Sequence, residues 1–387
     1  MLKKYSILIV TVSISLVYQG CIPDNQKKVT TSSILESVEI YETKVDFATG
    51  FKVSYFDHYK KVKIPLPWQS ADHGFEYLLV QRGAEVPEHD ENVQVIEIPL
   101  DRIVCTSTSH LPALDMLGIP EKLIGFPHTD YISSSSIRKL IDQGGVTDIG
   151  MEAGINIEML MELDPGVVID FAMGNNYDKY KSITKAGIPL VINADYMEET
   201  PLGRAEWIKF MALFFNLEKK ADSVFNEIKH NYDSLYSIAS KINQLPTVYS
   251  GIVYGDVWYM PGGQNFGAKF LSDARGDYLW KTNDISGSLK LSFETVYEKA
   301  NTADYWIGVG SYKSLKEIRE SDERYASFSA FKNGNVYSYN AKVGEKGGST
   351  FLELGYARPD IVLADLIKIL HPQLLPDHNL YFYEKLR

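Results

Sequence analysis

Hydrophobic and polar residues alternate in short runs between about Val38 and Leu100. Alternation places successive side chains on opposite faces of an extended chain, so each run predicts a β-strand with one buried face. Pro65 and Pro67 end the second run, because proline cannot donate a hydrogen bond to a strand ladder. We interpret this lead-in as an antiparallel sheet packed on the N-terminal lobe. Its predicted strands cover residues 51–55, 61–64, 75–80 and 93–98.

From Ile103 onward, short apolar runs alternate with stretches of helical periodicity. This order is typical of a parallel sheet covered by helices on both faces. Gly118 follows a short helical run and suits the left-handed conformation that ends many helices. The predicted strands cover 103–105, 123–126, 167–170, 188–192, 248–253 and 305–309, and the predicted helices cover 111–117, 157–163, 265–274 and 361–370.

A long helical region separates the two alternating halves. Pro201 suits the first turn of a helix, and Asn216 is predicted to interrupt the helical stretch. Apolar residues then recur at helical spacing from Leu217 to Ile242. At 1.5 Å per residue this helix would be about 38 Å long, enough to join two lobes. The pattern therefore predicts an α/β fold of two Rossmann-like lobes with mostly parallel sheets, joined by a long backbone helix, with a ligand cleft between the lobes.

The N-terminus has the pattern of a secretory signal. Lys3 and Lys4 precede an uncharged stretch that is too short to span a membrane comfortably, which takes about 20 apolar residues. This stretch ends at Cys21 and resembles a lipoprotein signal, in which the cysteine becomes the lipidated first residue. Secretion without a lipid is the alternative. The predicted segments are a signal peptide (1–20), a polar tether (21–37), an N-terminal lobe with its β-rich lead-in (38–200), a connecting helical region (201–243) and a C-terminal lobe (244–387).

Charge and cysteine content exclude several classes of function. A net charge of −11 argues against nucleic-acid binding and against a polybasic membrane patch, which both require basic surfaces. Cys21 and Cys105 are the only cysteines, too few for a disulfide scaffold or a thiolate metal site. His110 and His128 are candidates for part of a bare-metal site, but no acidic or histidine cluster completes the ligand set, so no metal site is predicted.

The motifs of common enzyme classes are missing from the sequence. It has no nucleophile elbow, P-loop, dinucleotide fingerprint or zinc-protease motif. Gly308-Val309-Gly310 follows a predicted strand but lacks the third glycine of a dinucleotide-binding turn. We therefore predict a binding protein without catalytic activity. A chelate-processing hydrolase on the same fold and a structural surface adhesin are the alternatives.

Several short motifs occur in a fixed order around the long helix. They are Leu117-Gly118-Ile119, Asn156-Ile157-Glu158, the run 163–169, the run 258–263 and the run 355–360. Together they resemble the cobalamin, siderophore and haem class of ABC substrate-binding proteins, from roughly Ile98 to Pro372. The resemblance implies a monomer, and the lipoprotein-like N-terminus predicts that it is anchored outside the cytoplasm to a bacterial membrane by lipid on Cys21. The resemblance also implies that this monomer captures a ferric siderophore or cobalamin, needs no intrinsic cofactor, and delivers the chelate to an ABC importer permease. Haem is an alternative ligand.

The same resemblance implies roles for individual residues. Glu158 and Glu294 match the carboxylates that pair with permease arginines, one on each lobe, although a favourable helix-dipole contact is the simpler interpretation. Ligand contacts are expected from loops that follow strands, because aromatic rings stack on corrins, porphyrins and catecholates and His or Tyr can ligate iron or cobalt. The principal candidates are His110, His128, Tyr131, Phe171, Tyr254, Trp258, Tyr259 and Tyr312, with Thr106, Ser107, Ser109, Met173, Lys342 and Lys346 beside them.

Overall fold

The computed structural model describes residues 41–151, 154–171 and 177–387. The predicted signal peptide and tether, with Cys21, lie outside the described residues, as does Met173. Residues 40–387 form one compact unit.

The lead-in forms a four-stranded sheet in the order β1-β2-β3-β4. Its first three strands are antiparallel, as predicted, whereas β3 and β4 are parallel. The prediction of a wholly antiparallel lead-in is therefore wrong at β4. Residues 82–93 carry the chain back along the sheet instead of closing a tight hairpin, and parallel neighbours need such a long connection. The strands are β1 (Lys52–Tyr55), β2 (Tyr59–Ile64), β3 (Phe75–Gln81) and β4 (Gln94–Ile98).

The first lobe is built on a parallel sheet in the order β11-β10-β5-β6-β7. Every residue of β5, β10 and β11 is buried, as expected for strands covered on both faces. The strands are β5 (Ile103–Cys105), β6 (Leu123–Phe126), β7 (Thr147–Asp148), β10 (Val167–Asp170) and β11 (Leu190–Ile192), and a small pair, β8 (Gly150–Met151) and β9 (Gly154–Ile155), lies beyond β7. The helices are α1 (Leu111–Leu117), α2 (Ser135–Asp142), α3 (Ile157–Leu163) and α4 (Tyr177–Lys185).

The second lobe has a sheet in the order β15-β12-β17-β18-β19, parallel except for β19, and an antiparallel sheet in the order β13-β14-β16. The run predicted as one strand at 248–253 is two strands, because Gly251 turns the chain at a φ of 83°. The strands are β12 (Thr247–Ser250), β13 (Ile252–Tyr254), β14 (Val257–Pro261), β15 (Asp277–Tyr278), β16 (Ser288–Leu291), β17 (Tyr305–Ile307), β18 (Val336–Ser338) and β19 (Glu384–Lys385). The helices are α8 (Phe266–Asp273), α9 (Phe293–Ala300), α10 (Leu315–Ser321), α11 (Ser329–Lys332) and α12 (Pro359–Leu370).

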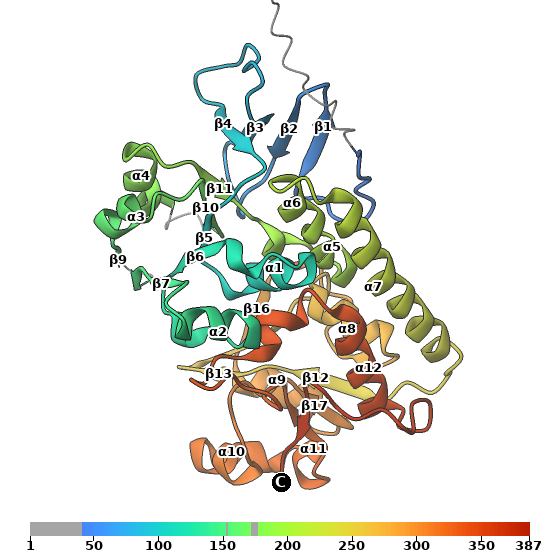
Figure 1. The fold of residues 1–387 in the computed structure, drawn as a ribbon. Coiled ribbons are helices and arrows are strands. Elements are labelled where there is room, and N and C mark those ends of the chain that lie inside the picture. The colour runs from blue at the N-terminus through green and yellow to red at the C-terminus, as the bar shows by residue number, and fades with distance from the viewer. Residues whose placement is uncertain (1–40, 152–153, 172–176) are drawn as a thin grey trace, which may run out of the picture. The chain divides into compact units, whose positions relative to one another are not determined.

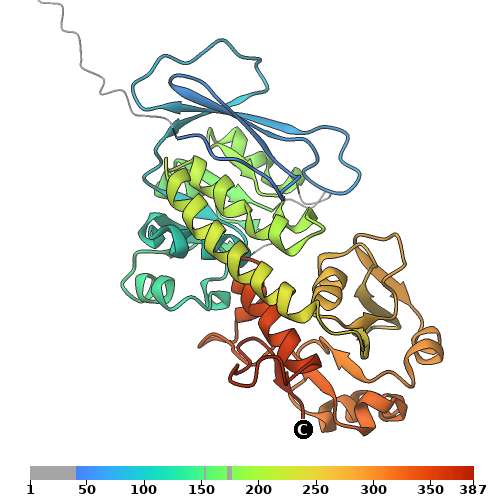
Figure 2. The same ribbon diagram turned by 90° about the vertical axis from the view of Figure 1, so that its right-hand side faces the viewer.

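Helices α5 (Pro201–Ala205), α6 (Trp207–Leu213) and α7 (Glu218–Ala239) connect the lobes. Asn216 stands in the left-handed conformation between α6 and α7, which agrees with the predicted interruption. The first half of α7 contributes Phe225 and Ile228 to the first-lobe core, and its second half contributes Tyr232 and Ala239 to the second-lobe core. Figure 2 shows α7, in yellow-green, extending from the first lobe to the second, where it packs on the red helix α12.

The lead-in sheet rests on the first lobe (Figure 1). The backbone amide of Ile192 in β11 donates to the Tyr77 hydroxyl over 3.0 Å, and Gln94 bonds both backbone groups of Leu190. A buried ion pair between Lys60 of β2 and Glu218 of α7 adds a second attachment. Burial lowers the pKa of Lys60 and raises that of Glu218, while the opposite charge of each partner counters these shifts.

We expect Glu218→Gln to lower the free energy of unfolding by about 3–5 kcal/mol, because it leaves the buried Lys60 ammonium without its counter-ion. Chemical denaturation of the purified chain measures this loss. The matched control is Lys63→Gln on the same strand as Lys60. It removes a half-exposed ion pair with Glu76 of β3 and should change the value by less than about 1 kcal/mol. Equal effects from the two variants would contradict a structural role for the buried pair.

Candidate functional site

A cavity of about 350 Å³ opens where the strands of the first-lobe sheet end. Parallel strands bring their carboxyl ends to one edge of a sheet, so the residues that follow β5, β6 and β10 meet there. The far wall comes from the second lobe. We call this the first-lobe cavity, and its lining is Thr106, Ser107, Thr108, Phe126, Pro127, Tyr131, Phe171, Gly347, Gly348, Ser349 and Leu352.

Hydrogen bonds to neighbouring residues hold the polar groups of this cavity in place. The Thr106 hydroxyl donates to the carboxylate of Asp170, which is fully buried at the end of β10. The Ser107 hydroxyl accepts from the Ser109 amide and caps a short helical turn. The cavity thus presents ordered hydroxyl groups beside the rings of Tyr131 and Phe171.

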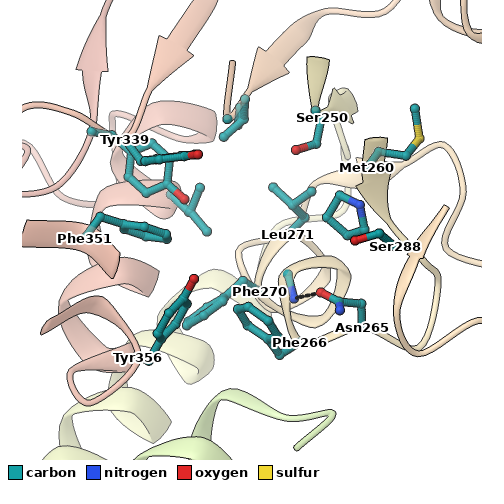
Figure 3. A pocket seen from close by; sticks show the side chains of 17 residues that line it. Ser250, Met260, Asn265, Phe266, Phe270, Leu271, Ser288, Tyr339, Phe351 and Tyr356 are labelled. Carbon is teal, nitrogen blue, oxygen red and sulfur yellow. Dashed lines mark hydrogen bonds between the residues drawn. The ribbon is translucent and has the colours of Figure 1, made fainter. Parts of the chain in front are cut away.

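A second cavity, of about 340 Å³, lies at the corresponding edge of the second-lobe sheet, and we call it the second-lobe cavity. Ser250, Ile307 and Tyr339 mark the ends of β12, β17 and β18 in its wall. Figure 3 shows Tyr339, Phe351 and Tyr356 on one side and Ser250 and Met260 on the other.

Aromatic packing orders that wall. The rings of Tyr339 and Phe351 are stacked with centroids 4.9 Å apart. The buried guanidinium of Arg204 lies 3.7 Å from the centroid of the Tyr356 ring and 4.4 Å from that of Phe266, a cation–π arrangement. This wall of the second-lobe cavity is therefore aromatic.

One π-helical turn, η7 (Phe351–Gly355), separates the two cavities. Phe351 lines the second-lobe cavity, and its neighbour Leu352 lines the first-lobe cavity. Glu353 points in a third direction, where its carboxylate accepts hydrogen bonds from the Ser133 and Ser134 amides of the first lobe. Burial raises the pKa of Glu353, and the hydrogen bonds from Ser133 and Ser134 oppose that shift.

Three of the principal ligand candidates lie together at the first-lobe cavity, beside Thr106 and Ser107, which were also predicted. Tyr131, with 57% of its surface exposed, and Phe171 line it, and the His128 ring lies 5.3 Å from the Tyr131 ring. His128 has a positive φ of 55°, which is unusual for a side-chain-bearing residue and turns the loop after β6. Their contact with a ligand stays a prediction.

His110 does not reach either cavity. It is buried beneath α6 beside a void of about 20 Å³, with Asp195 and Arg204 nearby. Burial lowers the pKa of His110, with the charge of Asp195 opposing, so a neutral ring is favoured. The expectation of a loop histidine open to ligand is corrected here, because the polar loop after β5 folds immediately into a helical turn.

Trp258 is likewise a core residue, with none of its surface exposed. Its indole N–H donates to the Ser250 carbonyl over 3.0 Å, and its ring packs on Trp306 and Phe328. The expectation that this ring faces a ligand is corrected, because Trp258 lies on β14, the middle strand of the small antiparallel sheet.

The other three candidate rings line neither cavity. Tyr254 ends β13 with 81% of its surface exposed, and the half-buried Tyr259 lies under the Lys290 ammonium. Tyr312 borders a separate surface hollow that also contains Glu294 and Arg324. Of the candidate rings, the structure therefore places Tyr131, Phe171 and the adjacent His128 at the first-lobe cavity and the others elsewhere.

Glu158 and Glu294 occupy equivalent positions at the starts of α3 and α9, the helices that precede β10 and β17. In each helix the residue two before the glutamate caps the first turn, Asn156 through the Met159 amide and Ser292 through the Thr295 amide. Both glutamates are exposed. Glu294 also forms an ion pair with Arg324 at 3.0 Å.

Sequence reasoning missed the serines that begin α2 and Glu353, and around Gly347 and Gly348 it named only the neighbouring Lys342 and Lys346. The only local signal was the glycine pair itself, which marks a close approach of backbones. Among the described residues, no group of three or more His, Cys, Asp or Glu side chains is placed to hold a metal ion. No helix within the described ranges is long and apolar enough to cross a membrane.

The sequence profile of periplasmic binding proteins matches residues 103–343. The chain belongs to this family. The assignment confirms the resemblance inferred from the motifs. The family and the similar solved structures are binding proteins. The lead-in sheet β1–β4 precedes the matched region.

Two uncharacterized lipoproteins of Methanocaldococcus jannaschii are similar to this periplasmic binding protein along its whole length. One is 27% identical and is covered over 97% of its own length, and the other is 24% identical and fully covered.

Solved structures share the two-lobe fold. A possible iron-binding protein of Staphylococcus epidermidis has a TM-score of 0.53 at 19% identity, with 70% of this chain and 99% of that one covered. A periplasmic haem-binding protein of Vibrio cholerae has a TM-score of 0.51 at 16% identity, with 68% and 98% covered. A Helicobacter pylori protein with Ni(II) bound has a TM-score of 0.56 at 17% identity, with 74% and 88% covered.

Because Trp258 fills the core, we expect Trp258→Ala to lower the free energy of unfolding by about 3–5 kcal/mol. Denaturant unfolding followed by circular dichroism checks this. Tyr254→Ala removes an exposed ring four residues away and should change the value by no more than about 0.5 kcal/mol. A fully stable Trp258→Ala variant would argue against the core role.

Proposed function

We propose that this protein is the lipid-anchored component of an ABC importer that captures a metal chelate, a ferric siderophore or cobalamin, and delivers it to the permease. The observation that carries the proposal is the first-lobe cavity, which has walls from both lobes. Ligand pockets occur preferentially at such interfaces. A ligand held there contacts both lobes at once.

The lining suits an organic chelate. Tyr131 and Phe171 offer ring faces for stacking, while Thr106, Ser107 and Thr108 offer hydroxyl groups that donate or accept hydrogen bonds. Metal chelation by the protein itself is less well supported, since the described residues hold no clustered metal ligands. Similar solved structures named for iron and haem support a metal-bearing ligand.

Haem is the second candidate ligand. A similar structure of Vibrio cholerae is described as a haem-binding protein, and the second-lobe cavity offers the aromatic wall that a porphyrin would stack against. The chelate test below distinguishes haem from siderophores and corrinoids.

Delivery requires the protein to stay at the membrane and to recognise the permease. The relatives named lipoproteins support anchoring through Cys21 outside the cytoplasm. Glu158 and Glu294 supply one exposed carboxylate on each lobe, each at a helix start, and such a pair fits an orientation-specific contact with two arginines of the permease. A monomer would present both carboxylates to the permease at once.

We expect the purified protein to retain the absorbance of cobalamin, haem or a ferric siderophore after incubation and desalting. Tyr131→Ala should weaken binding of the retained chelate by about 1–3 kcal/mol if its ring stacks on the ligand. Calorimetry measures the loss, and Tyr254→Ala, which removes an exposed ring remote from the cavities, should bind as the parent does. Tight binding of bare zinc or manganese with no chelate retained would overturn the proposal.

We expect Glu158→Arg with Glu294→Arg to reduce stimulation of transporter ATPase activity in proteoliposomes by about tenfold or more, because like charges at a docking surface cost several kcal/mol. Chelate affinity in solution should stay unchanged, since neither residue lines the first-lobe or the second-lobe cavity. Matched controls are Glu162→Arg and Glu298→Arg, which lie exposed one turn later on the same helices. If the variant with both Glu158→Arg and Glu294→Arg stimulates the transporter as well as these controls do, the two carboxylates only stabilise the helix starts.

A further inference from the structure

Residues 343–353, which we call the latch segment, belong to the second lobe and pack against the first lobe. We propose that Glu353 is a positioning residue that fastens the latch segment to the start of α2, and that the latch segment must lift for ligand to enter the first-lobe cavity. The role in ligand entry rests on the proposed function, whereas the fastening does not.

The fastening is a pair of hydrogen bonds to one buried carboxylate. Glu353, with 2% of its surface exposed, accepts from the Ser133 amide over 2.6 Å and from the Ser134 amide over 2.7 Å, one bond to each oxygen. Ser134 is the N-cap of α2, where backbone amides lack helical partners. Hydrogen bonds to an ionised acceptor are about twice as strong as neutral ones. Glu353 therefore supplies this helix start with an acceptor from the opposite lobe.

Close backbone contact supports the same conclusion independently. A side chain at Gly348 would collide with the Tyr131 carbonyl oxygen, and a Cβ at Gly344 would lie 2.9 Å from the Ser133 Cα. Within the latch segment, Val343 and Ser349 form a bridge, and the Gly344 amide donates to the Gly348 carbonyl over 2.7 Å. The segment thus forms a small hairpin that packs directly on the backbone of residues 131–133. Glycine is required at Gly344 and Gly348, because a side chain there would collide with that backbone.

The latch segment is also the second-lobe wall of the first-lobe cavity. Gly347, Gly348, Ser349 and Leu352 line it. The cavity measures about 350 Å³, at the small end of the range of roughly 300–1,000 Å³ that ligand pockets span. A ring-bearing chelate that exceeds this volume is enclosed by both lobes only when the latch segment moves outward. Separating Glu353 from α2 breaks two hydrogen bonds between the lobes, and lifting the latch segment also moves Phe351, a residue of the second-lobe core.

Limited trypsin digestion of the full chain tests the fastening without any ligand. Lys346 is exposed in the hairpin of the latch segment, and Lys241, exposed beyond the end of α7, is the internal reference. Glu353→Gln places an amide NH₂ opposite one of the two backbone donors. We expect this change to speed cleavage after Lys346 about tenfold relative to Lys241, because proteolysis follows the population of the open form. Gly348→Ala should do the same while Glu353 stays intact.

The matched control is Glu298→Gln, an exposed glutamate on α9, which should leave the cleavage ratio unchanged. An unchanged ratio in both Glu353→Gln and Gly348→Ala would overturn the latch. Equal acceleration at Lys346 and Lys241 in both variants would also overturn it, since that result indicates general unfolding. With a retained chelate, the parent should be protected at Lys346 and Glu353→Gln should release ligand faster. If no chelate binds, the proposed function fails while the digestion result still decides the fastening.

Discussion

The packing of α7 against both hydrophobic cores is the interaction on which the rest of the arrangement depends. Each lobe is a sheet that must be covered on both faces, and one helix contributes to both cores, with Phe225 and Ile228 in the first and Tyr232 and Ala239 in the second. A shared helix of 22 residues cannot bend sharply without losing one of these contacts. The helix therefore limits how far the lobes separate. Under our proposal, ligand entry depends instead on movement of the latch segment at their junction.

Several buried carboxylates in this protein accept hydrogen bonds from backbone amides of distant segments and hold those segments in place. Glu206 of the connecting region binds the amides of Asp46, Phe47 and Ala48, which holds the segment before the lead-in sheet. Asp365 of α12 binds the amides of residues 381–383 near the C-terminus. Burying a carboxylate is costly unless its oxygens are satisfied, and several N–H donors meet that requirement. Glu353 uses the same chemistry between lobes with only two donors.

At the junction of the lobes, three consecutive residues face three different surroundings. Phe351 lines the second-lobe cavity, Leu352 lines the first-lobe cavity, and Glu353 accepts hydrogen bonds from the first lobe. A shift of this single turn changes both cavities together. The same coupling offers a physical route by which an occupied cavity stabilises the closed arrangement, since a ligand shifts an equilibrium only through its different contacts with the two states.

Local patterns in the sequence determined the elements whose signals are local. Alternation identified β1, β2 and β3, the glycine after α1 ended that helix at Gly118, and helical spacing placed α7 within a few residues of its observed bounds. The order of strands and helices was enough for the two-lobe α/β fold. The capped helix starts at Glu158 and Glu294 were equally readable, because a cap acts within four residues.

Tertiary structure alone decided which side chains face the cavities. Trp258 and Tyr131 look alike as aromatic residues in a sequence. Trp258 is covered because the rings of Trp306 and Phe328, far along the chain, pack on it, whereas Tyr131 is left open at a sheet edge. Glu353 and Ser133 are 220 residues apart, so no local pattern records their hydrogen bond. Burial and partnership depend on which distant segments meet, and that is set by packing of the whole chain.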